Sequence, residues 1–161
     1  MIRHAHIDDL EVIVDIYNQA IASWFQTAFT EPQDVAGRID WFNGHDRHFP
    51  LFVYDVDGDV AGWLSIAPYR AGRGALRHTV EISYFIDRNF RHQGIGTRLL
   101  DYGINAARQL GYKTALAIII DANVASINLV EKFGFEQWGL LPGAVEFDGQ
   151  ECNHLYYGLK L

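Results

Sequence analysis

The chain has 161 residues, of which 49% are hydrophobic and 20% charged, a composition typical of soluble globular proteins. This length and composition predict one domain over residues 1–161 with its own hydrophobic core. The balance of 13 basic against 20 acidic side chains, a net charge of −7, argues against general affinity for nucleic acid or anionic membranes.

The composition also bears on location and on metals. No apolar run approaches the roughly 20 residues of a membrane-spanning helix, and the N-terminal residues lack the pattern of a signal peptide. The single cysteine, Cys152, excludes an internal disulfide and fits a reducing compartment, so a cytoplasmic protein is expected. No third ligand accompanies the pairs His4–His6 and His45–His48, so no metal site is expected.

The N-terminal part predicts one strand and two helices. Ile2–His6 alternates like a short strand, and Asp8 with Glu11 fits a capping box that begins a helix. Pro32 suits the first turn of a second helix that runs to about Phe42. The predicted apolar face of the first helix comprises Leu10, Ile13, Tyr17, Ala20 and Ile21.

The middle of the chain predicts three successive strands. Leu51–Asp55 and Val60–Pro68 flank Asp57-Gly58, a dipeptide typical of tight hairpin turns. Val80–Ile86 follows with no helical pattern before it. Three strands without an intervening helix argue against a doubly wound dinucleotide fold.

The C-terminal part alternates helices and strands. Gly111 and Gly134 are expected to end the two helices. The elements are predicted at Ile95–Leu110, Ala115–Ile120, Val124–Phe133, Phe135–Leu140 and His154–Leu161. The inward face of the first of these helices is predicted to comprise Ile95, Leu99, Tyr102, Ala106 and Leu110. The order β-α-α-β-β-β-α-β-α-β-β predicts an α/β fold with one mixed sheet of about seven strands and about four helices.

A glycine-bearing turn, R-H-Q-G-I-G-T at residues 91–97, is the most informative segment. It connects a predicted strand to a predicted helix, whose N-terminus presents unpaired N–H groups to an anion such as a diphosphate. Gly94 and Gly96 would let the anion approach the backbone closely. A dinucleotide fingerprint would need a small residue at Leu99, and the P-loop pattern is absent.

The turn and two neighbouring segments resemble the GNAT superfamily of N-acetyltransferases, in particular its phosphinothricin N-acetyltransferase branch. These segments are H-T-V-E-I-S-Y-F-I at 78–86 and N-V-A-S-I-N-L-V-E-K-F-G-F at 123–135. The resemblance covers residues 2–141 and implies the GNAT fold with acetyl-CoA as co-substrate and no metal. It further implies acetyl transfer to the primary amine of a small molecule, an amino acid or an analogue of the phosphinothricin or methionine sulfoximine type. Relatives are commonly dimers, so a homodimer is expected by analogy.

The resemblance also implies roles for individual residues. Glu81 would be the general base, because an ammonium must lose a proton before it attacks a thioester. The thioester would enter between splayed strands 80–86 and 115–120, where free N–H groups polarise its carbonyl. The implied coenzyme A-binding residues are Ile82, Tyr84, Ile86, Arg91, His92, Gln93, Gly94, Ile95, Gly96, Thr97, Arg98, Asn123 and Ser126.

For several of these residues, a purely structural or solvent-exposed role remains an alternative. Asn123 fits a helix N-cap, and Arg98 could be a solvated helix residue. The acceptor pocket is expected to include Phe29, Thr30, Arg70, Arg73 and Thr79. An arginine there would hold a carboxylate bidentately, but either arginine could equally be a solvated loop residue.

One position departs from the family pattern. Val130 stands where relatives usually carry a Tyr or His that acts as general acid or orienting group, and valine cannot donate a proton. Either the thiolate leaves unassisted, which a thiol pKa of about 8.5 tolerates, or another residue helps. Tyr156 is the first candidate for this catalytic role, followed by Tyr157 and His154.

The sequence is also compatible with two other functions. An anionic surface would favour a cationic acceptor, such as a protein N-terminus, a lysine or a polyamine. Because Val130 cannot donate a proton, the chain could instead be a non-catalytic sensor that binds acyl-CoA without turnover.

Overall fold

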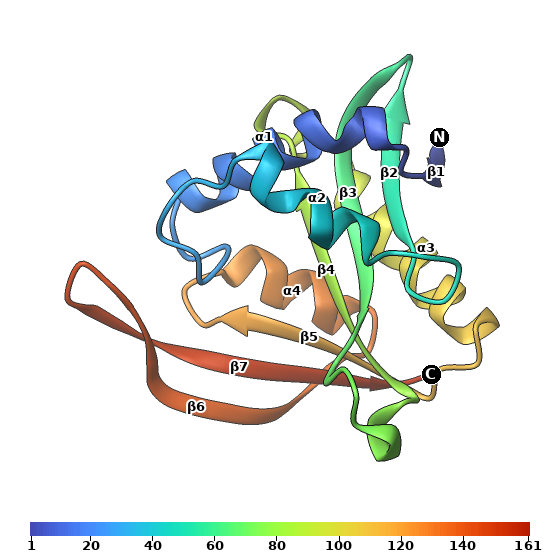
Figure 1. Cartoon of the computed structure of the whole chain (residues 1–161). Helices are drawn as coiled ribbons and strands as arrows, with labels where there is room; N and C mark the ends of the chain where they lie inside the picture. Colours follow the sequence, from blue (N-terminus) through green and yellow to red (C-terminus); the bar gives the residue numbers. More distant parts are fainter.

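A seven-stranded mixed sheet forms the centre of the computed structural model, which describes residues 1–161 (Figure 1). The strands lie in the order β1-β2-β3-β4-β5-β7-β6, and only β4 and β5 are parallel neighbours. The predicted α/β class and the order of elements are confirmed. The strands are β1 (Ile2–His4), β2 (Leu51–Val56), β3 (Asp59–Pro68), β4 (Thr79–Ile86), β5 (Thr114–Ile120), β6 (Glu136–Phe147) and β7 (Gln150–Lys160).

Helices cover both faces of the sheet, with α1 and α2 on the near side in Figure 1 and α3 and α4 behind it. The larger buried cluster joins α3 and α4 to the sheet through Leu99 and Val130, and the smaller one joins α1 through Ile13. None of the helices is long and apolar enough to cross a membrane. The helices are α1 (Leu10–Ala22), α2 (Val35–Asn43), α3 (Ile95–Gln109) and α4 (Val124–Lys132), with short 3-10 helices at Ile7–Asp9, Gly74–Leu76 and Arg88–Phe90.

The apolar face predicted for α1 is confirmed, because all five of its residues are buried. The predicted capping box is wrong. A 3-10 turn precedes α1, and its box is formed by His6 and Asp9 instead of Asp8 and Glu11. The Asp9 carboxylate accepts the His6 N–H at 2.7 Å and is held in place by the guanidinium of Arg3.

The start predicted for the second helix is also wrong. Helix α2 begins at Val35, where the Asp34 side chain caps the N–H of Gly37. Pro32 lies outside the helix. The backbone at Gln33 is held to α1 by two hydrogen bonds of 2.8 Å: the Asn18 amide donates to the Gln33 carbonyl, and its Oδ1 accepts the Gln33 N–H.

The predicted inward face of α3 is only partly right. Ile95 and Leu99 are buried, whereas Tyr102 and Leu110 are exposed. A Cβ at residue 103 would lie 2.7 Å from the Leu64 side chain. Because Gly103 has no side chain, the sheet can approach the helix closely at this position. The buried face therefore turns toward this close approach, where the additional buried residues are Leu100, Gly103, Ile104 and Ala107.

The last two strands are longer than predicted and form a projecting hairpin (Figure 1). Pro142 and Gly143 in the printed sequence end the apolar pattern, but a register shift between Leu141 and Val145 absorbs them and pairing continues to Phe147. The β2–β3 hairpin turns at Asp57-Gly58 as predicted, both in the left-handed region, with φ of 53° and 98°.

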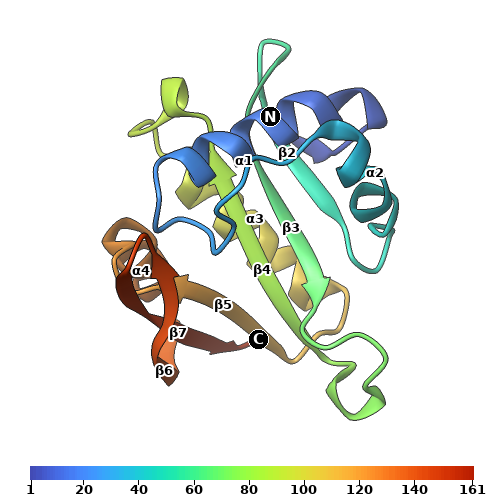
Figure 2. The ribbon, with the colours of Figure 1, turned by 60° about the vertical axis from the view of Figure 1, so that its left-hand side comes forward.

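Strands β4 and β5 separate soon after they meet. Their register runs only from the pair Thr79–Thr114 to the pair Glu81–Leu116. Beyond this point β4 pairs with β3 alone and β5 with β7 alone, and the two strands form a V (Figure 2). The side of β4 that faces β5 therefore has no strand partner from Ile82 onward.

Candidate functional site

The glycine turn forms the N-terminus of α3. Gly94 is the N-cap, with a φ of 76°, and no side chain caps the first turn of the helix. A Cβ at residue 94 would meet nothing within 4 Å, so the space above it is open. A Cβ at residue 96 would instead lie 3.3 Å from Leu129 of α4. Gly96 thus permits close packing of two helices, a role that the sequence did not suggest.

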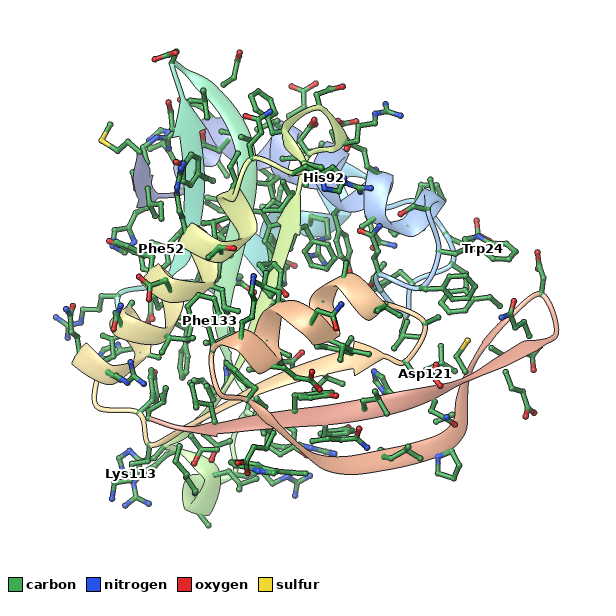
Figure 3. All side chains as sticks on the ribbon, turned by 180° about the vertical axis from the view of Figure 1, so that it is seen from behind. Trp24, Phe52, His92, Lys113, Asp121 and Phe133 are labelled. Atoms are coloured by element: carbon green, nitrogen blue, oxygen red, sulfur yellow. The ribbon has the colours of Figure 1, made fainter.

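A cavity of about 370 Å³ lies over this turn and is called the loop cavity. Figure 3 shows His92, one of its lining residues, at the turn between β4 and α3. Of the expected coenzyme A-binding residues, Ile82, Gln93 and Arg98 do not line it, and the Arg98 guanidinium donates to the Tyr54 hydroxyl at 2.7 Å. The lining residues are Gln26, Tyr84, Phe85, Ile86, Phe90, Arg91, His92, Gly94, Ile95, Gly96, Thr97, Asn123, Ala125, Ser126 and Leu129.

Asn123 serves as the N-cap of α4. Its Oδ1 accepts the N–H of Ser126 at 3.2 Å, which is the structural role expected for it. Both residues also line the loop cavity, so their polar side chains border the space beside the first turn of α4.

A smaller cavity of about 50 Å³, called the throat, lies where β4 and β5 separate. It shares Tyr84, Asn123 and Ser126 with the loop cavity. The throat also adjoins a third cavity, with which it shares Gln26, Ser83, Phe85 and Ile118. The three cavities therefore adjoin across the opening in the sheet. The throat is lined by Gln26, Ile82, Ser83, Tyr84, Phe85, Ala117, Ile118, Ile119, Asn123 and Ser126.

The third cavity, about 510 Å³, lies on the α1 and α2 side and is called the Glu81 cavity. Five of its 15 lining residues are Phe, Tyr or Trp, its charged groups are Glu81 and Arg38, and His154 lies at the same wall. The lining residues are Tyr17, Gln26, Thr27, Ala28, Phe29, Arg38, Trp41, Trp63, Ser65, Glu81, Ser83, Phe85, Ile118, Ile120 and His154.

Glu81 lies half-buried on β4, between Ala67 of β3 and Leu116 of β5. It forms no ion pair. Burial raises the pKa of its carboxyl above the ordinary value, and the neighbouring Ser83 hydroxyl opposes this rise only in part. A carboxylate in this state is a better proton acceptor than an exposed one.

Arg38 of α2 brings a guanidinium into the same cavity. It lies 4.0 Å from the centroid of the Trp41 ring and 5.1 Å from that of Tyr17. No carboxylate pairs with it and no protein group accepts a hydrogen bond from it, so its N–H donors are free for a ligand. Burial lowers the pKa of Arg38 somewhat, but a guanidinium remains charged at neutral pH.

His154, on β7, is half-buried at the wall of the Glu81 cavity. Burial lowers the pKa of its imidazole, which favours the neutral ring at neutral pH. The cavity thus carries one anionic and one cationic group, from Glu81 and Arg38.

Several residues expected at the acceptor pocket do not line this cavity. Phe29 does, but Thr30, Arg70, Arg73 and Thr79 do not. Arg70 is exposed, with its guanidinium 5.4 Å from the Tyr69 ring centroid. Arg38 lines this cavity but was not predicted from the sequence. A usable signal was its position three residues before Trp41, which suits a cation–π contact along a helix.

Gln26 was missed as well, and it lines all three cavities, as does Phe85 of β4. The Gln26 amide donates to the Ser23 hydroxyl at 2.8 Å. The loop that carries it is anchored to the β6–β7 hairpin, because the Trp24 ring stacks on Phe147 with a centroid distance of 5.9 Å and the Phe25 ring meets Phe147 edge-on at 5.2 Å.

The candidates for the general acid lie in different surroundings. Tyr156 is half-buried, 5.9 Å from the His154 ring and 6.5 Å from the Tyr69 ring, and lines none of the three cavities. The Tyr157 hydroxyl donates to Glu131 at 3.0 Å. Val130 is fully buried in the core. No cluster of three or more His, Cys, Asp or Glu side chains is arranged to hold a metal ion.

Comparison with known proteins identifies the family. Residues 13–135 match the acetyltransferase (GNAT) family. The chain belongs to this family. The acetyltransferase is 42% identical over 161 residues to a Bacillus subtilis protein provisionally named phosphinothricin acetyltransferase YwnH, covering 99% of this chain and 98% of the relative. It is 37% identical to the L-methionine sulfoximine/L-methionine sulfone acetyltransferase of Pseudomonas aeruginosa, covering 99% and 94%.

Solved structures agree with this assignment. A phosphinothricin acetyltransferase from Sinorhizobium meliloti in complex with AcCoA has a TM-score of 0.94 at 28% identity, covering 100% of this acetyltransferase and 88% of that chain. An N-acetyltransferase from Staphylococcus aureus has a TM-score of 0.94 at 35% identity, covering 99% and 97%. The GNAT fold, the resemblance to phosphinothricin acetyltransferases and the acyltransferase class are thereby confirmed.

Proposed function

We propose that this acetyltransferase transfers an acetyl group from acetyl-CoA to the primary amine of an amino acid or an amino-acid analogue. One observation carries the proposal. Glu81 and Arg38 face a single cavity, which adjoins the loop cavity through the throat. The names of the relatives, which concern phosphinothricin, methionine sulfoximine and methionine sulfone, support the same class of acceptor.

Acetyl-CoA would occupy the loop cavity. The uncapped N–H groups at the start of α3 and the open space above Gly94 suit its diphosphate, and Arg91 adds a positive charge. The pantetheine arm would follow the unpaired side of β4 into the throat. Free N–H groups of that strand would then polarise the thioester carbonyl and stabilise the oxyanion.

The amino-acid acceptor would lie in the Glu81 cavity with its two charged ends at opposite partners. The guanidinium of Arg38 would bind the carboxylate, and Glu81 would receive the ammonium. The aromatic wall would hold the acceptor side chain.

Glu81 would act as general base. It takes a proton from the ammonium, the free amine attacks the thioester carbon, a C–N bond forms and the C–S bond breaks. Direct attack needs no covalent intermediate on the enzyme. The lone thiol, Cys152, is buried in a separate cluster with Val145 and Phe147.

A thiol-release assay tests the proposal. The acceptors would be L-methionine sulfone, L-methionine sulfoximine and phosphinothricin, compared with spermidine, a lysine peptide and a peptide with a free N-terminus. Turnover is expected with the amino acids. Turnover with only spermidine or the peptides would contradict the proposed amino-acid acceptor and would show that the acceptor is a polyamine or a peptide. Coenzyme A binding without turnover of any acceptor would identify a sensor.

We also propose a cytoplasmic homodimer. The edge strand β6 supports the dimer, because it exposes Trp138, Leu140 and Leu141 by 45%, 46% and 43%. Sedimentation velocity should give a dimer that Leu141→Lys dissociates. Leu110→Lys at the C-cap of α3, an exposed leucine away from β6, is the control. A monomeric wild-type protein would contradict the proposal.

A further inference from the structure

The hydroxyl of Tyr84 is an anomaly of this site. It is the one buried side-chain oxygen or nitrogen in residues 1–161 without a hydrogen-bond partner. Buried polar groups are nearly always paired, since an unpaired one costs free energy. Burial raises the pKa of this phenol, with the nearby Ser126 hydroxyl opposing part of the rise, so the group stays protonated and is a free O–H donor.

The position of this donor is specific. Tyr84 lines both the loop cavity and the throat, together with Asn123 and Ser126. It lies on the part of β4 that has lost β5 as a neighbour. A thioester that passes from the loop cavity to Glu81 must therefore pass this side chain.

The other side chains considered as donors to the departing sulfur cannot donate, already form a hydrogen bond, or lie outside the loop cavity and the throat. Val130 is aliphatic and fully buried. The Tyr157 hydroxyl is bonded to Glu131, and Tyr156 lines neither the loop cavity nor the throat. The Tyr17 hydroxyl lies 2.7 Å from the Thr27 hydroxyl and borders only the Glu81 cavity.

We propose that the Tyr84 hydroxyl donates a hydrogen bond to the sulfur of the leaving coenzyme A and so stabilises the thiolate; this rests on the proposed function. As the C–N bond forms, the C–S bond breaks and its electron pair moves to sulfur. Glu81 already holds the proton of the ammonium, so the second proton of the attacking nitrogen passes to water. The phenol keeps its proton, because a thiol is the stronger acid. Released coenzyme A then takes its proton from water.

Removal of the hydroxyl alone tests the kinetic part. Tyr84→Phe keeps the ring, and its Tm should not fall, since no hydrogen bond is lost. We expect kcat to fall at least tenfold while KM for both substrates stays within twofold. The matched control is Tyr112→Phe, whose hydroxyl bonds to the His48 carbonyl at 2.8 Å outside the three cavities. An unchanged kcat in Tyr84→Phe with a loss in Tyr156→Phe would overturn the proposal and favour Tyr156.

A second readout needs no turnover. The thiol of bound coenzyme A can be titrated by the ultraviolet absorbance of its thiolate. A hydrogen bond from Tyr84 should favour the thiolate about tenfold in the wild type relative to Tyr84→Phe, a pKa lower by about one. Equal titrations in two proteins that bind coenzyme A would overturn this role alone. Failure of the wild type to bind coenzyme A would overturn the proposed function with it.

Discussion

Glu81 and Leu116 form the last register pair between β4 and β5 before the two strands separate. The carboxylate therefore stands at the vertex of the opening in the sheet. It lines the cavity on one side of the sheet, whereas the glycine turn borders the cavity on the other. In the proposed function, Glu81 would meet the amine on the α1 and α2 side, and the thioester would arrive from the α3 side.

Replacement of this carboxylate should separate catalysis from binding. Glu81→Gln keeps the shape of the side chain but removes its basicity, so kcat/KM for the amino acid at pH 7 should fall at least tenfold. The affinity for acetyl-CoA, measured by calorimetry, should not change. Glu136→Gln, at an exposed position that begins β6, is the matched control. A parallel loss of affinity would instead point to a structural role.

The pH profile should report the same group. Burial raises the pKa of Glu81 above the ordinary 4.5, so kcat/KM should fall as the pH drops through this raised value and the base becomes protonated. A raised carboxyl pKa also means that the folded chain binds this proton more tightly than the unfolded chain. Ionisation of Glu81 therefore lowers stability as the pH rises, and Glu81→Gln should keep or increase Tm at pH 7. An acid limb that persists in Glu81→Gln belongs to another group.

Arg38 should determine the preference for a carboxylated acceptor. Arg38→Met should raise KM for L-methionine sulfone at least tenfold and leave KM for its carboxamide within twofold, because only the first compound offers a carboxylate to the guanidinium. Arg108→Met removes an exposed arginine of α3 and serves as control. Equal losses for both acceptors would assign Arg38 to packing against Trp41 rather than to recognition.

The turn at the start of α3 should be sensitive to charge. Gly96→Asp puts a carboxylate beside the expected diphosphate, and the affinity for acetyl-CoA should fall at least a hundredfold. Gly96→Ala tests the packing effect alone, because the Leu129 side chain at 3.3 Å needs to yield only slightly. A change below threefold is expected for the alanine variant in the same calorimetric titration. Similar losses in both variants would attribute the effect to the contact between α3 and α4.

Local patterns predicted most of the fold. Strand alternation, the Asp57-Gly58 turn and the helix-ending glycines depend on neighbours in sequence, and these predictions were confirmed. The face of α3 was predicted wrongly in part because the approach of Leu64 to Gly103 depends on distant packing. The hairpin of β6 and β7 was predicted too short for a similar reason, since pairing across the hairpin tolerates the irregular residues 142–144.

Some residues of the candidate site could likewise be predicted from local sequence, whereas others could not. The glycine turn and its flanking strand are contiguous, so their motif is visible in one stretch of sequence. Arg38 and Gln26 reach the cavities from α2 and from the loop after α1, each far along the chain from Glu81. Only the tertiary fold brings these segments together. The same holds for Tyr84, whose unpaired hydroxyl is a property of its surroundings and not of any motif.

Gln26 borders the loop cavity, the throat and the Glu81 cavity, so a molecule in any of them would lie beside the same amide. In the proposed function, the two substrates share this contact, and their binding is expected to be thermodynamically coupled. Reciprocity then requires that acetyl-CoA changes acceptor affinity by the same factor as the acceptor changes the affinity for acetyl-CoA. A substitution of Gln26 that changes the affinity for the acceptor is therefore expected to change the affinity for acetyl-CoA as well.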